Sequence, residues 1–176
     1  MRFEKASIEG LVQCFPSIYK DERGLFFESY NHQSFVKNAV PEDFVQDNHS
    51  WSKKGVVRGL HFQKSPYAQG KLVRCVTGKV IDVVVDIRPD SPTYGQHEKF
   101  ILDAKIGNML YVPGGFAHGF LTLEESIFVY KCTNFWNKEA ESGILWNDTQ
   151  LQIDWGISNP IVSEKDLKLP TFKELK

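Results

Sequence analysis

The chain has 176 residues, of which 41% are hydrophobic, and its 21 Lys and Arg nearly balance its 22 Asp and Glu. This length is typical of one domain with its own core, so we expect a single domain over residues 1–176. A formal net charge of −1 gives no field that would attract nucleic acid or an anionic membrane, so neither is expected as a partner.

The first ten residues lack the apolar stretch of a signal peptide, and no later segment is apolar over the about 18 residues that a membrane helix needs. The three cysteines, Cys14, Cys75 and Cys132, are odd in number and far apart, which fits neither a disulfide framework nor a paired metal motif. We therefore expect a cytoplasmic protein whose cysteines are buried, reduced thiols.

Short runs rich in valine, isoleucine and aromatic residues predict β-strands, because glycine, proline or asparagine interrupts them at short intervals. The predicted strands cover residues 24–30, 44–51, 56–63, 71–77, 79–87, 99–102, 108–112, 119–122 and 126–135. Helix is predicted only as a turn or two that Asn31 caps, with Phe35 and Val36 facing inward, and as a short segment after Ser163. The pattern indicates an all-β sandwich or barrel.

Residues 80–86 are too apolar for a strand that is wetted on one face, so this strand is predicted to lie centrally between layers. Its two aspartates, Asp82 and Asp86, then need partners inside the protein. The polar stretch that begins at Lys165 is expected to wrap over the surface.

His61 is the first side chain that suggests chemistry. Alternation along residues 56–63 places it on one strand face with Val57, Gly59 and Gln63. An imidazole that faces a barrel interior is either a base or a hydrogen-bonded core histidine, and the pattern leaves both interpretations open. His118 follows the sharp turn at residues 113–115, which could aim its ring, and here packing is the alternative.

Lys71 and Tyr130 suggest a polar interior. Lys71 alternates with Val73 and Cys75, so its ammonium either projects into the interior and needs a partner or snorkels to water. Tyr130 alternates with apolar neighbours, and its ring either only packs or also offers a hydroxyl to a cavity.

A catalytic metal would need about three converging histidine or carboxylate ligands, and no such cluster is visible in the sequence. His61 is followed by phenylalanine and glutamine, His118 stands alone, and His32, His49 and His97 lie in polar stretches. Dinucleotide, P-loop and hydrolase-elbow motifs are also missing, so we expect neither a metal nor a cofactor.

Seven longer motifs follow one another along nearly the whole chain. They are DERGLFFES at residues 21–29, FVQDNHS at 44–50, GVVRGLHFQ at 55–63, QGKLVR at 69–74, DVVVDIR at 82–88, GFAHGF at 115–120 and SEKD at 163–166. In these motifs the chain resembles the dTDP-4-dehydrorhamnose 3,5-epimerase family. The resemblance implies an all-β, cupin-type double-stranded β-helix (jelly roll) with a few short helices.

The resemblance also implies a reaction, the conversion of dTDP-4-dehydro-6-deoxy-α-D-glucose to dTDP-4-dehydro-β-L-rhamnose for deoxysugar and surface polysaccharide synthesis. The C4 ketone acidifies the hydrogens at C3 and C5, so a base can form an enolate and a proton can return to the other face. His61 matches the family's base and Asp166 the acid that orients it. Lys71 matches the cation near the C4 oxygen, and Tyr130 the acid on the opposite face.

Further positions match family residues that contact substrate. Arg23 and Arg58 carry guanidinium forks suited to a diphosphate. The others are Glu28, Gln46, Asn48, His118, Glu141 and Lys165. Trp136 stands where members often carry tyrosine, so a ring can still stack on a base or sugar while the substrate preference stays open. The family further implies a homodimer whose amino-terminal segments cross between subunits.

Three alternatives stay open. An epimerase of the same family that inverts only C3 or only C5, or that acts on another 4-keto sugar nucleotide, would carry the same catalytic residues. A noncatalytic cupin sugar-binding module would need Arg23 and Arg58 but no base or proton donor. A metal-dependent cupin oxygenase or isomerase would need the ligand cluster that the sequence lacks.

Overall fold

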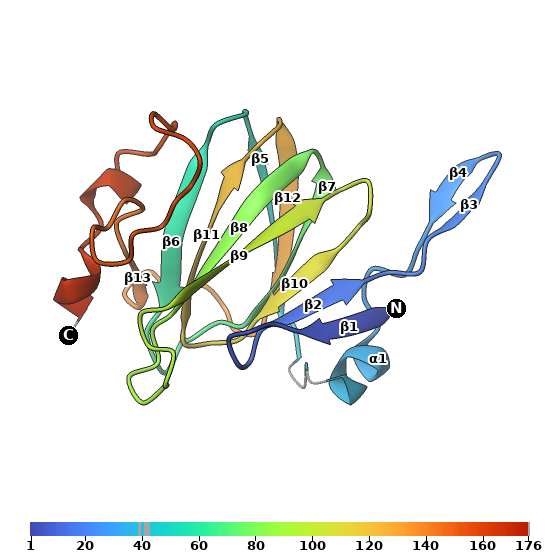
Figure 1. Cartoon of the computed structure of the whole chain (residues 1–176). Helices are drawn as coiled ribbons and strands as arrows, with labels where there is room; N and C mark the ends of the chain where they lie inside the picture. Colours follow the sequence, from blue (N-terminus) through green and yellow to red (C-terminus); the bar gives the residue numbers. More distant parts are fainter. Residues whose placement is uncertain (39, 41–42, 176) are drawn as a thin grey trace.

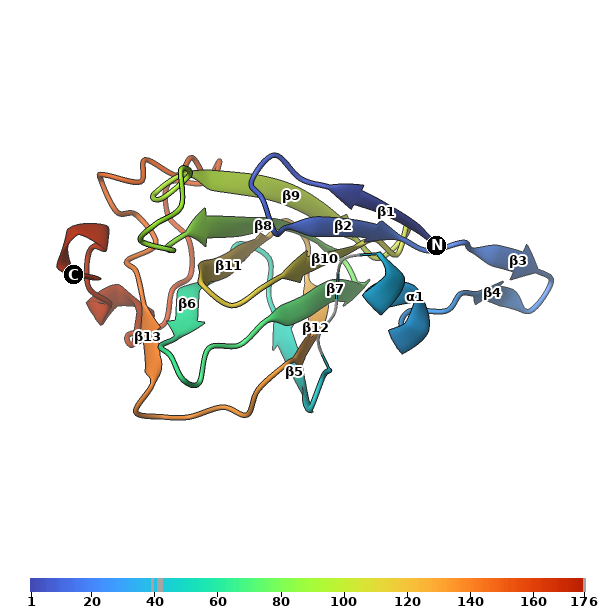
Figure 2. The ribbon, with the colours of Figure 1, turned by 90° about the horizontal axis from the view of Figure 1, so that it is seen from below.

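The computed structural model describes residues 1–38, 40 and 43–175. In this part of the chain, two antiparallel sheets pack against each other (Figure 1). The six-stranded sheet has the order β1-β2-β10-β7-β12-β5, and the five-stranded sheet has the order β13-β6-β11-β8-β9. Figure 2 shows the two layers from below, with strands of both sheets enclosing the space between them. The predicted all-β fold is confirmed.

The strands are β1 (Arg2–Lys5), β2 (Val12–Phe15), β3 (Tyr19–Asp21), β4 (Gly24–Phe26), β5 (Gln46–Ser52), β6 (Val57–Gln63), β7 (Lys71–Thr77), β8 (Lys79–Asp86), β9 (His97–Asp103), β10 (Met109–Val112), β11 (Phe116–Thr122), β12 (Ser126–Cys132) and β13 (Glu141–Gly143). The helices are α1 (His32–Lys37), η1 (Asp166–Lys168) and η2 (Phe172–Leu175), the last two being 3₁₀ helices. Each predicted strand is present, whereas β1, β2, β3 and β13 were not predicted. These four are short and lack a long apolar run, so pairing with neighbouring backbone forms them.

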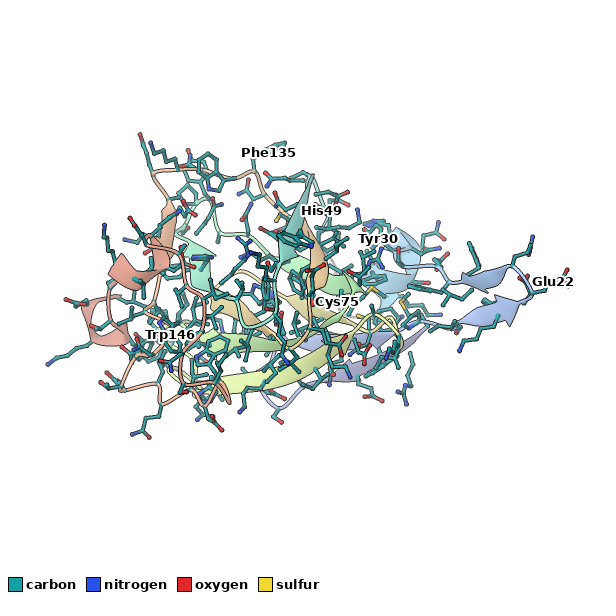
Figure 3. The ribbon with its side chains drawn as sticks, turned by 90° about the horizontal axis from the view of Figure 1, so that it is seen from above. Glu22, Tyr30, His49, Cys75, Phe135 and Trp146 are labelled. Carbon is teal, nitrogen blue, oxygen red and sulfur yellow. The ribbon has the colours of Figure 1, made fainter. Side chains whose placement is uncertain are left out.

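The hairpin of β3 and β4 projects away from the two sheets (Figures 1 and 2). Figure 3 shows Glu22 at its tip, far from the body of the molecule. The strand predicted over residues 24–30 ends at Phe26, because its partner β3 is only three residues long and offers no further backbone groups. Tyr19 and Phe26 are 67% and 71% exposed, so the hairpin leaves aromatic surface uncovered.

Helix α1 begins as predicted, since Asn31 Oδ1 accepts a hydrogen bond from the Ser34 amide at 3.2 Å. Phe35 is fully buried and packs on the rings of Phe3 and Tyr30. The prediction that Val36 also faces inward is wrong, because this side chain is 42% exposed. Consecutive residues point about 100° apart around a helix, and this short helix buries only one face.

Strand β8 is buried on both faces, as its apolar run predicted. Val80 and Val84 face the core between the sheets, while Val83 and Val85 pack under the carboxy-terminal segment. That segment lies against the five-stranded sheet (Figure 1). The prediction that the stretch from Lys165 only wraps over the surface is therefore wrong. It buries Asp166 and Phe172, which are each 4% exposed.

The two aspartates of β8 have the partners that burial requires. Asp82 bonds to His118, and Asp86 accepts hydrogen bonds from Arg88, Ser91 and Thr93. Burial by itself raises the pKa of the Asp86 carboxyl, but these donors outweigh burial and hold the pKa well below its usual value. Asp86 is therefore a charged anchor for the loop after β8.

Candidate active site

A β-bulge in β6 determines which side chains face the space between the sheets. Opposite β11, His61 pairs with His118 and Arg58 with Phe120, so β6 has one more residue than β11 in this interval. Cross-strand partners share a face, and Phe120 belongs to the core between the sheets. Arg58 and His61 therefore both point inward.

Glycines at the bulge allow the backbones of β6 and β11 to approach each other closely. Gly59 has a φ of +121°, and a Cβ there would lie 2.6 Å from Gly119 Cα. The sequence-based prediction that Val57 shares a face with His61 is wrong. Val57 packs on the other side of the sheet, under the carboxy-terminal segment, because the extra residue reverses the alternation.

His61 and Asp166 form a hydrogen-bonded pair across 105 residues of sequence. His61 Nε2 lies 2.9 Å from Asp166 Oδ1, and the Gly59 amide donates to Asp166 Oδ2 at 3.1 Å. Burial raises the pKa of the Asp166 carboxyl, but the bonds from His61, Gly59 and Ser163 outweigh it, and the pKa lies below its usual value. An ionised Asp166 requires a hydrogen on Nε2, so Nδ1 of the neutral ring keeps its lone pair.

Lys71 and Tyr130 of the six-stranded sheet line a cavity that His61 also lines. The cavity has a volume of about 110 Å³ and is lined by Gln46, Asn48, His61, Phe62, Gln63, Gln69, Lys71, Tyr130, Trp136 and Glu141. Lys71 Nζ lies 5.9 Å from the centre of the Tyr130 ring. Of the two interpretations of Lys71, the structure favours the inward-facing ammonium.

The cavity shifts the pKa of both groups. Burial lowers the pKa of Lys71, and the nearby Cys132, Asp82 and Glu141 oppose this shift. Burial raises the pKa of Tyr130 above its ordinary value of 10.0, so the phenol holds its proton at neutral pH. A base on one sheet thus shares a cavity with a cation and a proton donor on the other sheet.

Several of the predicted substrate-contacting side chains line this cavity. Trp136 is 54% exposed at its wall. Gln46 accepts from the Trp136 amide at 2.9 Å and donates to Asn48 at 3.1 Å. Asn48 in turn donates to the Cys132 thiol at 3.4 Å.

Arg58 and Lys165, which are both predicted to contact substrate, lie at a second hollow. His61, Ser163 and Asp166 also line this hollow, together with nearby valines and an isoleucine. Arg58 donates to Ser52 Oγ at 3.0 Å and to the Trp51 carbonyl at 3.2 Å. Lys165 forms a 2.7 Å ion pair with Glu141, which also lines the cavity of His61 and Lys71.

His118 occupies a buried position next to the site. Its Nε2 lies 2.8 Å from Asp82 Oδ2, and both side chains are almost completely buried. The structure thus favours the core interpretation, in which strand register and not the preceding turn aims the ring. Asp82 Oδ1 has no hydrogen-bond partner among the described residues. The apolar run around Asp82 signalled a buried carboxylate but not its partner.

Arg23 and Glu28 do not reach the cavity. Arg23 pairs with Asp21 at 2.6 Å on the projecting hairpin, and Glu28 accepts from Asn31 at 3.1 Å. Both side chains are exposed.

The structure also shows the state of the cysteines: Cys14, Cys75 and Cys132 are free and buried, as predicted. No group of three or more His, Cys, Asp or Glu in this part of the chain is arranged to hold a metal ion. None of the helices at residues 1–38, 40 and 43–175 is long and apolar enough to cross a membrane.

A family model described as dTDP-4-dehydrorhamnose 3,5-epimerase matches residues 5–174. The chain belongs to this epimerase family. The epimerase of Shigella flexneri is 51% identical over 98% of this chain and 96% of its own length. The epimerase of Escherichia coli K12 is 47% identical over 99% of this chain and 96% of its own.

Solved structures of the epimerase family share the fold. The enzyme of Bacillus anthracis, with TDP and pyrophosphate bound, has a TM-score of 0.95 at 43% identity and covers 97% of this chain and 99% of its own. That of Legionella pneumophila, in complex with dTDP-4-keto-L-rhamnose, has a TM-score of 0.95 at 41% identity and covers 99% and 94%. The cupin-type jelly roll that the family resemblance implied is therefore confirmed.

Proposed function

We propose that the chain is a single-domain epimerase that inverts C3 and C5 of dTDP-4-dehydro-6-deoxy-α-D-glucose to give dTDP-4-dehydro-β-L-rhamnose, a step of dTDP-L-rhamnose biosynthesis. The observation that carries the proposal is the shared cavity, in which the His61–Asp166 pair of one side meets Lys71 and Tyr130 of the other. These groups are the ones that enolate chemistry needs, because it requires a base, a charge for the oxyanion and an acid.

The proposed reaction begins at His61 Nδ1, which takes the proton from C3 or C5 while Asp166 stabilises the imidazolium. The electron pair of the broken C–H bond moves onto the C4 oxygen. Lys71 stabilises this enolate oxygen more than the neutral ketone, which lowers the barrier. The Tyr130 hydroxyl then gives its proton to the opposite face, and exchange with solvent restores the protonation of both side chains.

Substrate binding is proposed to use the nucleotide as a handle. Arg58 offers a guanidinium to the diphosphate, and the exposed ring of Trp136 offers a stacking surface to the base. The Bacillus anthracis relative holds TDP and pyrophosphate, and the Legionella pneumophila relative holds a dTDP-4-keto sugar, which supports this class of ligand. Gln46, Asn48, His118, Glu141 and Lys165 remain proposed contacts or supports of the sugar and phosphates.

The test is proton NMR of the 4-keto substrate incubated with the protein in deuterated water. Inversion with deuterium at both C3 and C5, lost in His61→Ala, is the expected result. Deuterium and inversion at C3 alone would instead support the single-centre alternative. A solved structure similar to this chain supports that alternative: it is a 3'-monoepimerase of Streptomyces bikiniensis, 34% identical with a TM-score of 0.89. If His61→Ala kept both inversion and deuterium incorporation, the proposed role of His61 would be contradicted.

We also propose that the protein is a homodimer acting in the cytoplasm. Trp51 and Val76 are 51% and 42% exposed on the outer face of the six-stranded sheet, and Phe26 is exposed on the hairpin. A second copy would cover this surface. It would also bring Arg23 and Glu28 of one subunit toward the other subunit's cavity. The three buried free thiols agree with a reducing compartment.

Light scattering would measure the oligomeric state, and subunit mixing would test whether sites are shared. Arg23→Ala and His61→Ala are each expected to be inactive as pure proteins. If sites are shared, refolding an equal mixture should restore about a quarter of the wild-type rate, because half of the dimers are mixed and each contains one intact site. A mixture that stays inactive would contradict sharing, and a monomeric mass would contradict the dimer.

A further inference from the structure

The loop between β12 and β13 carries Trp136, and it is fastened by amide side chains. Gln63, at the end of β6, is 7% exposed. Its Nε2 donates to the Tyr67 carbonyl at 2.6 Å and to the Phe135 carbonyl at 3.2 Å. Its Oε1 accepts from the Asn137 amide at 2.6 Å. Gln63 therefore binds the backbone on both sides of Trp136.

Two loops meet at this position. Tyr67 belongs to the loop between β6 and β7, whereas Phe135 and Asn137 belong to the loop between β12 and β13. Gln69 adds a bond across the same two loops, from its Nε2 to the Asn134 carbonyl at 2.7 Å. Figure 3 shows Phe135 on its loop at the edge of the molecule, where few packing contacts could hold the chain. Polar bonds to the sheet must supply the order that packing does not.

The Trp136 side chain itself is weakly held. Trp136 is 54% exposed, and its backbone amide donates a hydrogen bond to Gln46 Oε1. Because the backbone is anchored, an exposed ring on it loses less conformational freedom when it stacks on a flat ligand than a ring on a mobile loop would. The position of the backbone therefore decides whether the ring is ready to stack.

Gln63 is suited to hold that position but not to react. Both hydrogens of its amide are committed to backbone carbonyls, and an amide neither gains nor loses a proton near neutral pH. Each bond contributes about 0.5–1.5 kcal/mol, and the bonds cooperate because they close two loops onto one strand end.

We propose that Gln63 is a positioning residue that presents Trp136 to the aromatic base of a nucleoside diphosphate, and so sets nucleotide affinity without taking part in proton transfer. This inference rests on the proposed function only for the identity of the ligand. It predicts a defect in KM and in binding of the nucleotide alone, with kcat preserved.

The test uses Gln63→Met, which keeps the length of the side chain and removes all three bonds. The expected result is a roughly tenfold weaker binding of dTDP, measured by calorimetry, and a similar rise in KM, with kcat for solvent exchange within about twofold of wild type. Thermal unfolding of each variant shows that the protein is folded at the assay temperature. Gln13→Met, in β2 and outside the cavity, is the control and should leave dTDP binding unchanged.

A double-mutant cycle separates action through Trp136 from a general loosening. If Gln63 acts through the ring, Trp136→Ala should weaken dTDP binding by itself, and adding Gln63→Met should then change it by less than about twofold. Fully additive effects, or a Gln63→Met variant with unchanged dTDP affinity, would overturn the proposal. Calorimetry does not depend on turnover, so a wild-type protein that binds dTDP but does not epimerise would reject the proposed function and leave this inference testable.

Discussion

Asp166→Asn is the substitution that most directly tests the arrangement around the proposed base. In the native protein Asp166 Oδ2 accepts a hydrogen bond from the Gly59 amide, and Oδ1 accepts one from His61 Nε2. An asparagine has only one oxygen. The Gly59 amide can only donate, so the oxygen should turn toward it and the NH₂ group toward His61. The imidazole then keeps its lone pair on Nε2 and carries its hydrogen on Nδ1, which no longer faces substrate as a base.

The size of the effect follows from the cost of returning to the active tautomer. That tautomer would leave two donors, the asparagine NH₂ and the imidazole N–H, facing each other at about 1–3 kcal/mol each. The sum of about 2–6 kcal/mol corresponds to a loss between roughly 30-fold and 10⁴-fold. The His61 side chain is 32% exposed, so water relieves part of the cost. We therefore expect exchange at C3 and C5 to fall by about 10²–10³-fold.

The assay measures the rate of deuterium incorporation by NMR, together with the tautomer of His61 from ¹⁵N chemical shifts. Asp148→Asn is the matched control, because Asp148 is also buried and accepts backbone hydrogen bonds of the carboxy-terminal segment without contacting His61. It should lower the free energy of unfolding by about 1–3 kcal/mol and leave the exchange rate of folded protein unchanged. An Asp166→Asn protein with hydrogen on Nδ1 but near-normal exchange would refute the reasoning.

Tyr130→Phe should still exchange deuterium through His61 while net inversion falls by a much larger factor, and equal losses of both would show that the phenol acts in enolate formation. Burial lowers the pKa of Lys71 below 10.5, so the ammonium loses its charge as pH rises through this lowered value. The value of kcat/KM should therefore decline before pH 10.5. A pH profile that stays flat to that pH would contradict the role of Lys71. Prolonged treatment with a chelator should leave the epimerisation rate unchanged, because Lys71 and not a metal ion stabilises the enolate charge. Activity that is lost to the chelator and restored by one divalent metal would overturn this assignment. Gly59→Ala places a Cβ 2.6 Å from Gly119 Cα at a residue with positive φ. Denaturant unfolding should therefore show that the free energy of unfolding falls by about 3 kcal/mol or more. A fall of less than about 1 kcal/mol would contradict the packing argument.

The strands that sequence predicted best are those whose own side chains decide their conformation. The run of β8 is apolar on both faces, and the structure buries it on both. Strand β13, with the sequence ESG, forms because its backbone pairs with β6, and no local pattern could indicate that. Helix α1 was located by its cap, yet its exposed Val36 shows that a short apolar pair does not define which residue faces the core.

The site was predicted in part for a similar reason. Strand alternation put Lys71 and Tyr130 on faces shared with apolar residues but left open whether either lines a cavity, and both do. Alternation failed in β6, since the bulge at Gly59 depends on a close approach to another strand. Only family resemblance could join His61 to Asp166, which lie 105 residues apart. The anchoring by Gln63 escaped prediction, because hydrogen bonds between loops leave no periodic signal.

The division of the site between two sheets has a stereochemical meaning. Packed sheets lie about 10 Å apart, so a sugar ring inserted between them is touched by different strands on its two faces. In the proposed reaction, hydrogen therefore leaves toward β6 and returns from β12. The handedness of the product is then set by the layering of the fold. Phe128, Tyr130 and Cys132 alternate along one face of β12, so moving the phenol to either neighbouring inward position would shift the donor by about 7 Å without changing the face it serves. Such a shift is larger than a pyranose ring, so the donor would reach neither C3 nor C5. The relocated phenol should therefore abolish inversion, while exchange of hydrogen through His61 continues.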